Sequence, residues 1–118
     1  MSKKTIWITG GSTGIGKALA IKFASKGWNV AVSARREELL NELSNTYENI
    51  SAFPLDVTDK LKCEEVFNQI KNKFQDIDIC FFSTGTWNPK KEKDIDIEQM
   101  EDVFKINFFG TVNTIKAV

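Results

Sequence analysis

One glycine-rich segment constrains the fold of this chain more than any other feature. The segment reads T-G-G-S-T-G-I-G over residues 9–16, and it lies between a β-prone run, 5–9, and a helical pattern, 15–26. Glycines permit a tight turn and a close backbone approach to a ligand, and the helix N-terminus beyond them offers N–H groups to a phosphate. The segment therefore predicts a strand–turn–helix unit that holds a phosphate-containing ligand. The alternative is a glycine-rich turn without a ligand.

The same glycines fit a second phosphate-binding pattern. Residues 11–17 match G-x-x-x-x-G-K, the opening of a P-loop. A P-loop continues with Ser or Thr, whose hydroxyl binds Mg²⁺, and Ala18 stands there instead. This departure disfavours a P-loop nucleotide triphosphatase.

Strand-like and helical patterns alternate along the rest of the chain. Strands are predicted at 29–34, 50–56 and 77–82, and helices at 37–46, from Thr58 or Asp59 to 74, and from 97 onward. Such alternation implies βαβ units with right-handed crossovers and a parallel sheet. We therefore predict an α/β fold, a Rossmann-type doubly wound parallel sheet with four strands in the order 3-2-1-4. Pro54 cannot donate a ladder hydrogen bond, so the strand at 50–56 is placed at the sheet edge.

Apolar residues recur at helical spacing in the predicted helices. In the first helix they are Ile15, Leu19 and Phe23. In the third they are Cys63, Phe67, Ile70 and Phe74, and in the last they are Met100, Phe104 and Phe108, followed by Thr111 and Ile115.

The composition excludes several classes of protein. The chain of 118 residues has no His and two Cys, which removes Ser-His-Asp catalysis, imidazole zinc sites and a disulfide framework. Sixteen basic and sixteen acidic residues give no net charge, which argues against nucleic acid as a partner. No apolar run approaches the roughly 18 residues of a membrane span, and no signal-peptide pattern is present. We expect a soluble cytoplasmic protein without a membrane partner.

The spacing T-G-x-S-x-G-I-G resembles the cofactor signature of the short-chain dehydrogenase/reductase family. Three further motifs carry the resemblance through the chain: Asp56-Val57, Phe82-Ser83-Thr84-Gly85 in place of the usual Asn-Asn-Ala-Gly, and Ile106-Asn107-Phe108-Phe109-Gly110. The resemblance implies a dinucleotide cofactor, with Asp56 hydrogen-bonded to the adenine amine. In that family the corresponding long helix often packs against its mate, which implies a homo-oligomer, a dimer or tetramer. The alternative is that Phe104 and Phe108 of this helix belong to the core.

The residues after the second strand bear on the choice of cofactor. An NAD site places an acidic residue there, but Ala34 is neutral and Arg35 follows at once. A guanidinium can fork onto a ribose 2′-phosphate, so NADP is expected and NAD is less favoured. The alternative is that Arg35 and Arg36 merely begin a solvated helix. The predicted cofactor-binding residues are Gly10, Ser12, Thr13, Gly14, Ile15, Gly16, Arg35, Arg36, Asp56, Val57, Ser83 and Gly85.

The family's catalytic residues are mostly absent from this chain. Its Tyr and Lys lie four residues apart, but the single tyrosine, Tyr47, is followed four positions later by Ser51. By resemblance, Asn107 alone belongs to the catalytic set. We therefore expect residues 1–118 to be one dinucleotide-binding unit that stops before the catalytic Ser, Tyr and Lys and is inactive alone. The longer protein would transfer a hydride between NADP(H) and a carbonyl or alcohol substrate, and the alternative is a non-catalytic dinucleotide-binding module.

Overall fold

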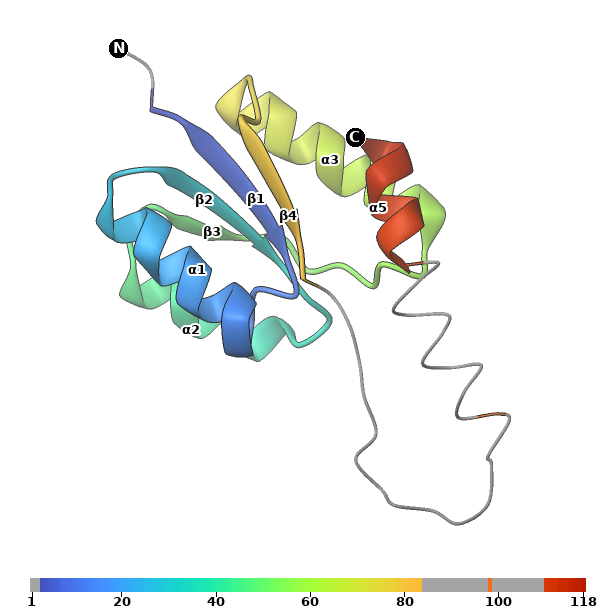
Figure 1. The fold of residues 1–118 in the computed structure, drawn as a ribbon, viewed down its shortest axis with the longest axis horizontal. Helices are drawn as coiled ribbons and strands as arrows, with labels where there is room; N and C mark the ends of the chain where they lie inside the picture. Colours follow the sequence, from blue (N-terminus) through green and yellow to red (C-terminus); the bar gives the residue numbers. More distant parts are fainter. Residues whose placement is uncertain (1–2, 84–97, 99–109) are drawn as a thin grey trace.

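A four-stranded parallel sheet forms the centre of the molecule (Figure 1). The computed structural model describes residues 3–83, 98 and 110–118. The strands are β1 (Thr5–Thr9), β2 (Asn29–Ser33), β3 (Ile50–Ala52) and β4 (Ile79–Phe82). All neighbouring pairs are parallel, and the order is β3-β2-β1-β4. The predicted sheet and its strand order are confirmed.

Helices cover both faces of this sheet. The helices α1 (Gly14–Ser25) and α2 (Glu37–Thr46) lie on one face, and α3 (Lys60–Phe74) and α5 (Thr111–Ala117) lie on the other (Figure 1). Asp59 is the N-cap of α3, because its carboxylate accepts the Lys62 N–H at 3.1 Å. The result is a three-layer α/β arrangement.

Each face of the sheet has its own core, because alternate residues of a strand point to opposite faces. Ile6 and Ile8 of β1 pack with apolar residues of α1 and α2. Trp7, between them in sequence, packs instead with residues of α3, which include Cys63, and with Val57. Both cores therefore meet the central strand β1, which is buried along its whole length.

The buried face of α1 differs from the stripe of large residues in its sequence. Its buried residues are Gly16, Ala20 and Ala24. Leu19 and Phe23 are only partly buried against the core, and Ile15 is 73% exposed. The small residues face the sheet because they let the helix approach it closely, and the large residues flank the contact.

The edge strand β3 is confirmed in position but is shorter than predicted. The regular strand ends at Ala52, two residues before Pro54. The chain still follows β2 beyond that point, since the Phe53 N–H donates to the Val32 carbonyl at 2.8 Å and the Leu55 N–H donates to the Ala34 carbonyl at 3.0 Å. Pro54 has no N–H to contribute, so the ladder becomes an irregular loop.

The inward face of α5 is polar in the part that the structure describes. Asn113 and Thr114 are buried, whereas Ile115 is largely exposed. Met100, Phe104 and Phe108 of the predicted long helix lie outside the described residues. Among the described residues, no helix is both long enough and apolar enough to cross a membrane.

Candidate functional site

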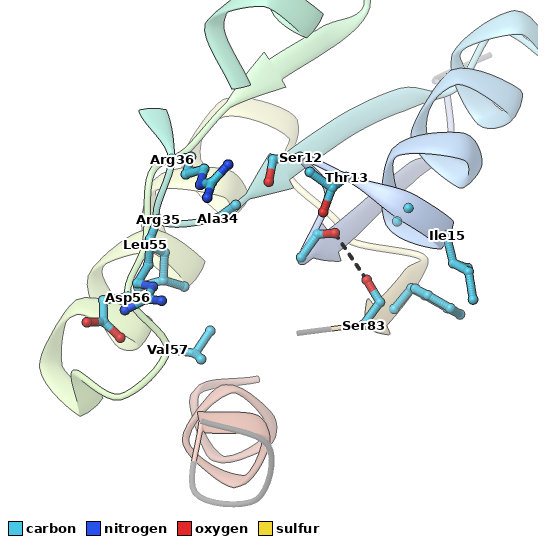
Figure 2. Close-up of a pocket in the computed structure, with 14 residues that line it drawn as sticks. Ser12, Thr13, Ile15, Ala34, Arg35, Arg36, Leu55, Asp56, Val57 and Ser83 are labelled. Atoms are coloured by element: carbon cyan, nitrogen blue, oxygen red, sulfur yellow. Dashed lines mark hydrogen bonds between the residues drawn. The ribbon is translucent and has the colours of Figure 1, made fainter. Parts of the chain in front are cut away.

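The loops that follow the four strands meet around one recess at the carboxyl end of the sheet (Figure 2). Its volume is about 790 Å³, within the range of about 300–1,000 Å³ typical of small-molecule sites. The residues that line it are Gly10, Ser12, Thr13, Gly14, Ile15, Gly16, Ala34, Arg35, Arg36, Leu55, Asp56, Val57, Phe81 and Ser83. Open α/β sheets bind ligands in this position, at the switch point of the strand order.

The glycine turn between β1 and α1 forms one wall of the recess. Two hydrogen bonds fix its start, as the N–H groups of Gly10 and Gly11 donate to the Ser33 carbonyl at 2.8 and 3.2 Å. Gly14 has φ of +58°, a left-handed conformation that favours glycine. The N-cap residue Thr13 makes no side-chain cap hydrogen bond. The first N–H groups of α1 are therefore not capped by Thr13 and lie at the rim of the recess.

Gly16 allows the turn, the helix and β4 to meet. A Cβ at this position would overlap the Gly10 carbonyl and would lie 2.7 Å from Ser83 Oγ. Ser83, just past β4, donates from its hydroxyl to the Thr9 carbonyl at 2.5 Å and from its N–H to the same oxygen at 3.1 Å. Ser83 therefore fastens the end of β4 to the end of β1 and closes this side of the recess.

Two arginines after β2 supply positive charge to the opposite wall. Figure 2 shows the Arg36 side chain directed toward Ser12 of the glycine turn. The Arg35 side chain lies beside Leu55 and Asp56. The two guanidinium groups thus reach different parts of the recess, although they are adjacent in sequence.

The loop between β3 and α3 forms the floor beside these arginines. Asp56 accepts hydrogen bonds from the Thr58 N–H at 3.0 Å and the Thr58 hydroxyl at 2.7 Å, which makes an Asx turn. The Val57 carbonyl accepts from Asn113 Nδ2 at 3.1 Å and from the Cys63 thiol at 3.6 Å. The loop is therefore held both by its own turn and by the helices beneath it.

The cysteines lie away from the recess lining. Burial raises the pKa of the Cys63 thiol, and nearby carboxylates reinforce the rise against the opposing hydrogen bond with Thr114. Burial also raises the pKa of Cys80, which is partly buried in β4. Both thiols are thus held in the neutral form that is poorly nucleophilic.

The structure brings together every predicted site residue that it describes. The glycine-turn residues, both arginines, Asp56, Val57 and Ser83 all line the recess. Gly85 and Asn107 lie outside the described residues. Tyr47 is not in this lining and instead lines a smaller recess between α1 and α2.

Three residues of the lining, Ala34, Leu55 and Phe81, are not among the predicted cofactor-binding residues. Leu55 and Phe81 each lie near the end of a predicted strand, 50–56 or 77–82, and were given no site role. Their place next to motif residues, Asp56 and Ser83, was the available signal.

The sheet order and the recess at the strand ends define an α/β protein of Rossmann type. Within that class the chain belongs to the short chain dehydrogenase family, whose model matches residues 4–118. The chain is 27% identical to an uncharacterized oxidoreductase of Staphylococcus aureus (strain MW2), over 99% of this chain and 52% of the relative. It is 29% identical to sulfoacetaldehyde reductase 2 of Chromohalobacter salexigens, over 96% of this chain and 46% of that relative.

Solved structures show the same architecture. A short chain dehydrogenase from Bacillus anthracis has a TM-score of 0.89 at 29% identity, with 97% of this chain and 49% of that chain covered. The structure of ElxO with NADP bound has a TM-score of 0.88 at 30% identity, with 98% and 48% covered. The chain therefore spans about half the length of the relatives it matches.

Proposed function

We propose that this chain is the NADP(H)-binding part of an oxidoreductase that interconverts a carbonyl and an alcohol. The observation that carries the proposal is the recess in which eleven predicted cofactor-binding residues, all those within the described part, line one space. ElxO, a structural neighbour, has been solved with NADP and with NADPH bound, which supports the same cofactor here.

The glycine turn suits the phosphates that join the two nucleotides. The N-terminus of α1 carries a partial positive charge and N–H groups that Thr13 does not cap. Gly14, with no heavy atom within 4 Å of where its Cβ would lie, leaves room for a ligand against the backbone. These features favour an anionic group at this rim.

Arg36 and Ser12 suit a 2′-phosphate better than Arg35, the residue that the sequence favoured for this role. The Arg36 side chain is directed toward Ser12, and Ala34 adds no negative charge to that wall (Figure 2). An arginine forms strong, often bidentate hydrogen bonds with a phosphate. We assign the 2′-phosphate chiefly to Arg36 with Ser12, and we place Arg35 over the nucleoside beside Leu55.

Asp56 and Val57 suit the adenine end of the cofactor. Asp56 lines the recess, the Asx turn with Thr58 fixes its carboxylate, and we assign this carboxylate as the acceptor for an exocyclic amine. The apolar side chains of Leu55 and Val57 offer contact area for a base. The adenine is therefore assigned to the loop between β3 and α3.

NADPH supplies the hydride of such a reaction when it is bound. A relative named as an aldehyde reductase supports a carbonyl substrate class. Four further assignments rest on sequence motifs and family resemblance. Asn107 belongs to the catalytic set, and Gly85 contacts the cofactor. Residues 1–118 form a single cofactor-binding unit, and the protein is a homo-oligomer. A cytoplasmic location rests on the sequence alone.

A non-catalytic dinucleotide-binding module is the alternative function. It shares the recess and the cofactor but lacks turnover. Steady oxidation of NADPH by the natural full-length protein with any of a panel of aldehydes and ketones would exclude this alternative.

The direct test is a calorimetric titration of the natural full-length protein with NADPH and with NADH. We expect NADPH to bind about 10- to 100-fold more tightly, because the 2′-phosphate adds charge-assisted hydrogen bonds. Comparable dissociation constants would contradict the NADP assignment. Absence of binding to either nucleotide would contradict the dinucleotide function itself.

A further inference from the structure

We infer that Asn113 of α5 is a positioning residue for the base-binding loop, residues 55–59, and thereby helps set the preference for adenine. Asn113 does not line the recess; it acts from behind, through the backbone of Val57. The inference rests on the proposed function, since it assigns a role within the same cofactor site.

The backbone of the base-binding loop bonds to the sheet at Leu55, and within the loop the Asp59 N–H donates to the Asp56 carbonyl at 3.0 Å. The Leu55 N–H bonds to the end of β2, at the Ala34 carbonyl. After Leu55 the chain leaves the sheet and turns toward α3. Val57 is 5% exposed, so its carbonyl is a buried acceptor that needs a donor from outside the sheet.

Asn113 supplies that donor. Its side-chain amide is 3.1 Å from the Val57 carbonyl oxygen, and the residue itself is 8% exposed. The other contact to this oxygen is the Cys63 thiol at 3.6 Å, and a thiol is a weak donor. The amide of Asn113 is therefore the stronger of the two hydrogen bonds that hold this peptide group.

Side-chain packing reinforces the same contact. A Cβ on Gly110, the N-cap of α5, would overlap Cγ2 of Val57, so the start of the helix presses directly on the loop. Figure 2 shows Val57 between the recess and α5. Val57 thus lines the recess, and both its side chain and its carbonyl contact α5.

The position of Asp56 depends on this arrangement. Asp56 precedes Val57, and its Asx turn with Thr58 spans that residue. A rotation of the Val57 peptide group would therefore turn the Asp56 carboxylate away from its present direction. If the Asp56 carboxylate accepts a hydrogen bond from the adenine amine, then loss of the Asn113 amide should weaken the preference for adenine over other bases. It should not only lower the stability of the protein.

The test compares NADPH with its hypoxanthine analogue, in which an oxygen replaces the exocyclic amine. For the natural full-length protein, we expect NADPH to bind about tenfold more tightly, the value of one hydrogen bond to a charged group. In Asn113→Leu, which keeps the approximate shape but has no donor, we expect this preference to fall to about twofold or less. Asn113→Ser is the second variant should leucine prevent folding, because the shorter serine side chain cannot reach the carbonyl.

Asn49→Leu is the matched control. The Asn49 side-chain amide also donates to backbone carbonyls, those of Ala24 and Trp28 at 2.8 and 2.7 Å, but Asn49 does not line the recess. This variant should lose stability and keep the tenfold preference. If the role of Asn113 were purely structural, Asn113→Leu and Asn113→Ser would lose stability and keep the tenfold preference for NADPH, as the control does.

A folded Asn113 variant that keeps the full preference would overturn the inference. Equal affinity of the unaltered protein for NADPH and its hypoxanthine analogue would also overturn it, because the loop would then make no interaction with the exocyclic amine of the base. Failure of the unaltered protein to bind either nucleotide would instead be a failure of the proposed function, and the two results are distinguishable.

Discussion

The two faces of the sheet differ in the polarity of the side chains buried on them. The face covered by α1 and α2 is packed with apolar side chains, such as Ile8 and Leu40. The buried polar residues of the described part lie on the face of α3 and α5: Thr5, Thr9, Ser33, Asn113 and Thr114. On this second face the indole N–H of Trp7 donates to Ser33 Oγ at 2.9 Å, and Asn113 holds the Val57 carbonyl.

The difference indicates that the two faces contribute to the structure in different ways. Apolar packing is non-directional and adds stability, whereas buried hydrogen bonds fix groups in defined places. The polar face holds the base-binding loop through Asn113 and thus contributes to the geometry of the recess. The apolar face supports the same strands through side-chain packing.

Truncation on the apolar face should have the largest effect on stability. Ile8→Ala should reduce the free energy of unfolding by about 2–5 kcal/mol, because it leaves a cavity between β1 and the helices above it. Urea denaturation of the natural full-length protein measures this loss. Ile15→Ala removes the same atoms from a side chain that is 73% exposed and should cost less than about 0.5 kcal/mol. Equal losses in the two variants would contradict the assignment of the apolar core.

The smallest effect is expected at Thr9, on the polar face. Its hydroxyl is buried, and it has no hydrogen-bond partner among the described residues. Thr9→Val should therefore leave the free energy of unfolding unchanged or raise it by up to about 1 kcal/mol, since an unsatisfied polar group is removed at nearly constant shape.

Thr5 provides the comparison within the same strand and face. Its hydroxyl accepts from Asn29 Nδ2 at 3.4 Å, so Thr5→Val should be destabilising by about 0.5–1 kcal/mol. Thermal unfolding of both variants gives the order of the two effects. A Thr9→Val variant less stable than Thr5→Val would contradict this description of the polar face.

Much of the fold could be predicted from the sequence because its signals are local. The glycine turn, the strand runs and Pro54 each determine a nearby element, and parallel connectivity then leaves few possible sheet orders. The recess residues were predicted for the same reason, since each follows directly on a strand.

The contacts that could not be predicted depend on distant packing. Nothing local shows that Ala20 rather than Leu19 faces the sheet, because both lie at helical spacing. Asn113 is a polar residue in an amphipathic stretch, and its burial depends on a carbonyl 56 positions earlier in the chain. Such pairings emerge only when α3 and α5 are placed side by side.

The central claim is that the recess at the strand ends binds NADP(H), and charge reversal at Arg36 tests it most directly. Arg36 is exposed, so Arg36→Glu should fold normally. Lys26→Glu, at the far end of α1, makes the same charge change outside the recess. We predict that Arg36→Glu weakens NADPH binding at least tenfold more than it weakens NADH binding, while Lys26→Glu changes neither by more than about twofold. An Arg36→Glu protein that binds NADPH as tightly as the unaltered protein would contradict the claim.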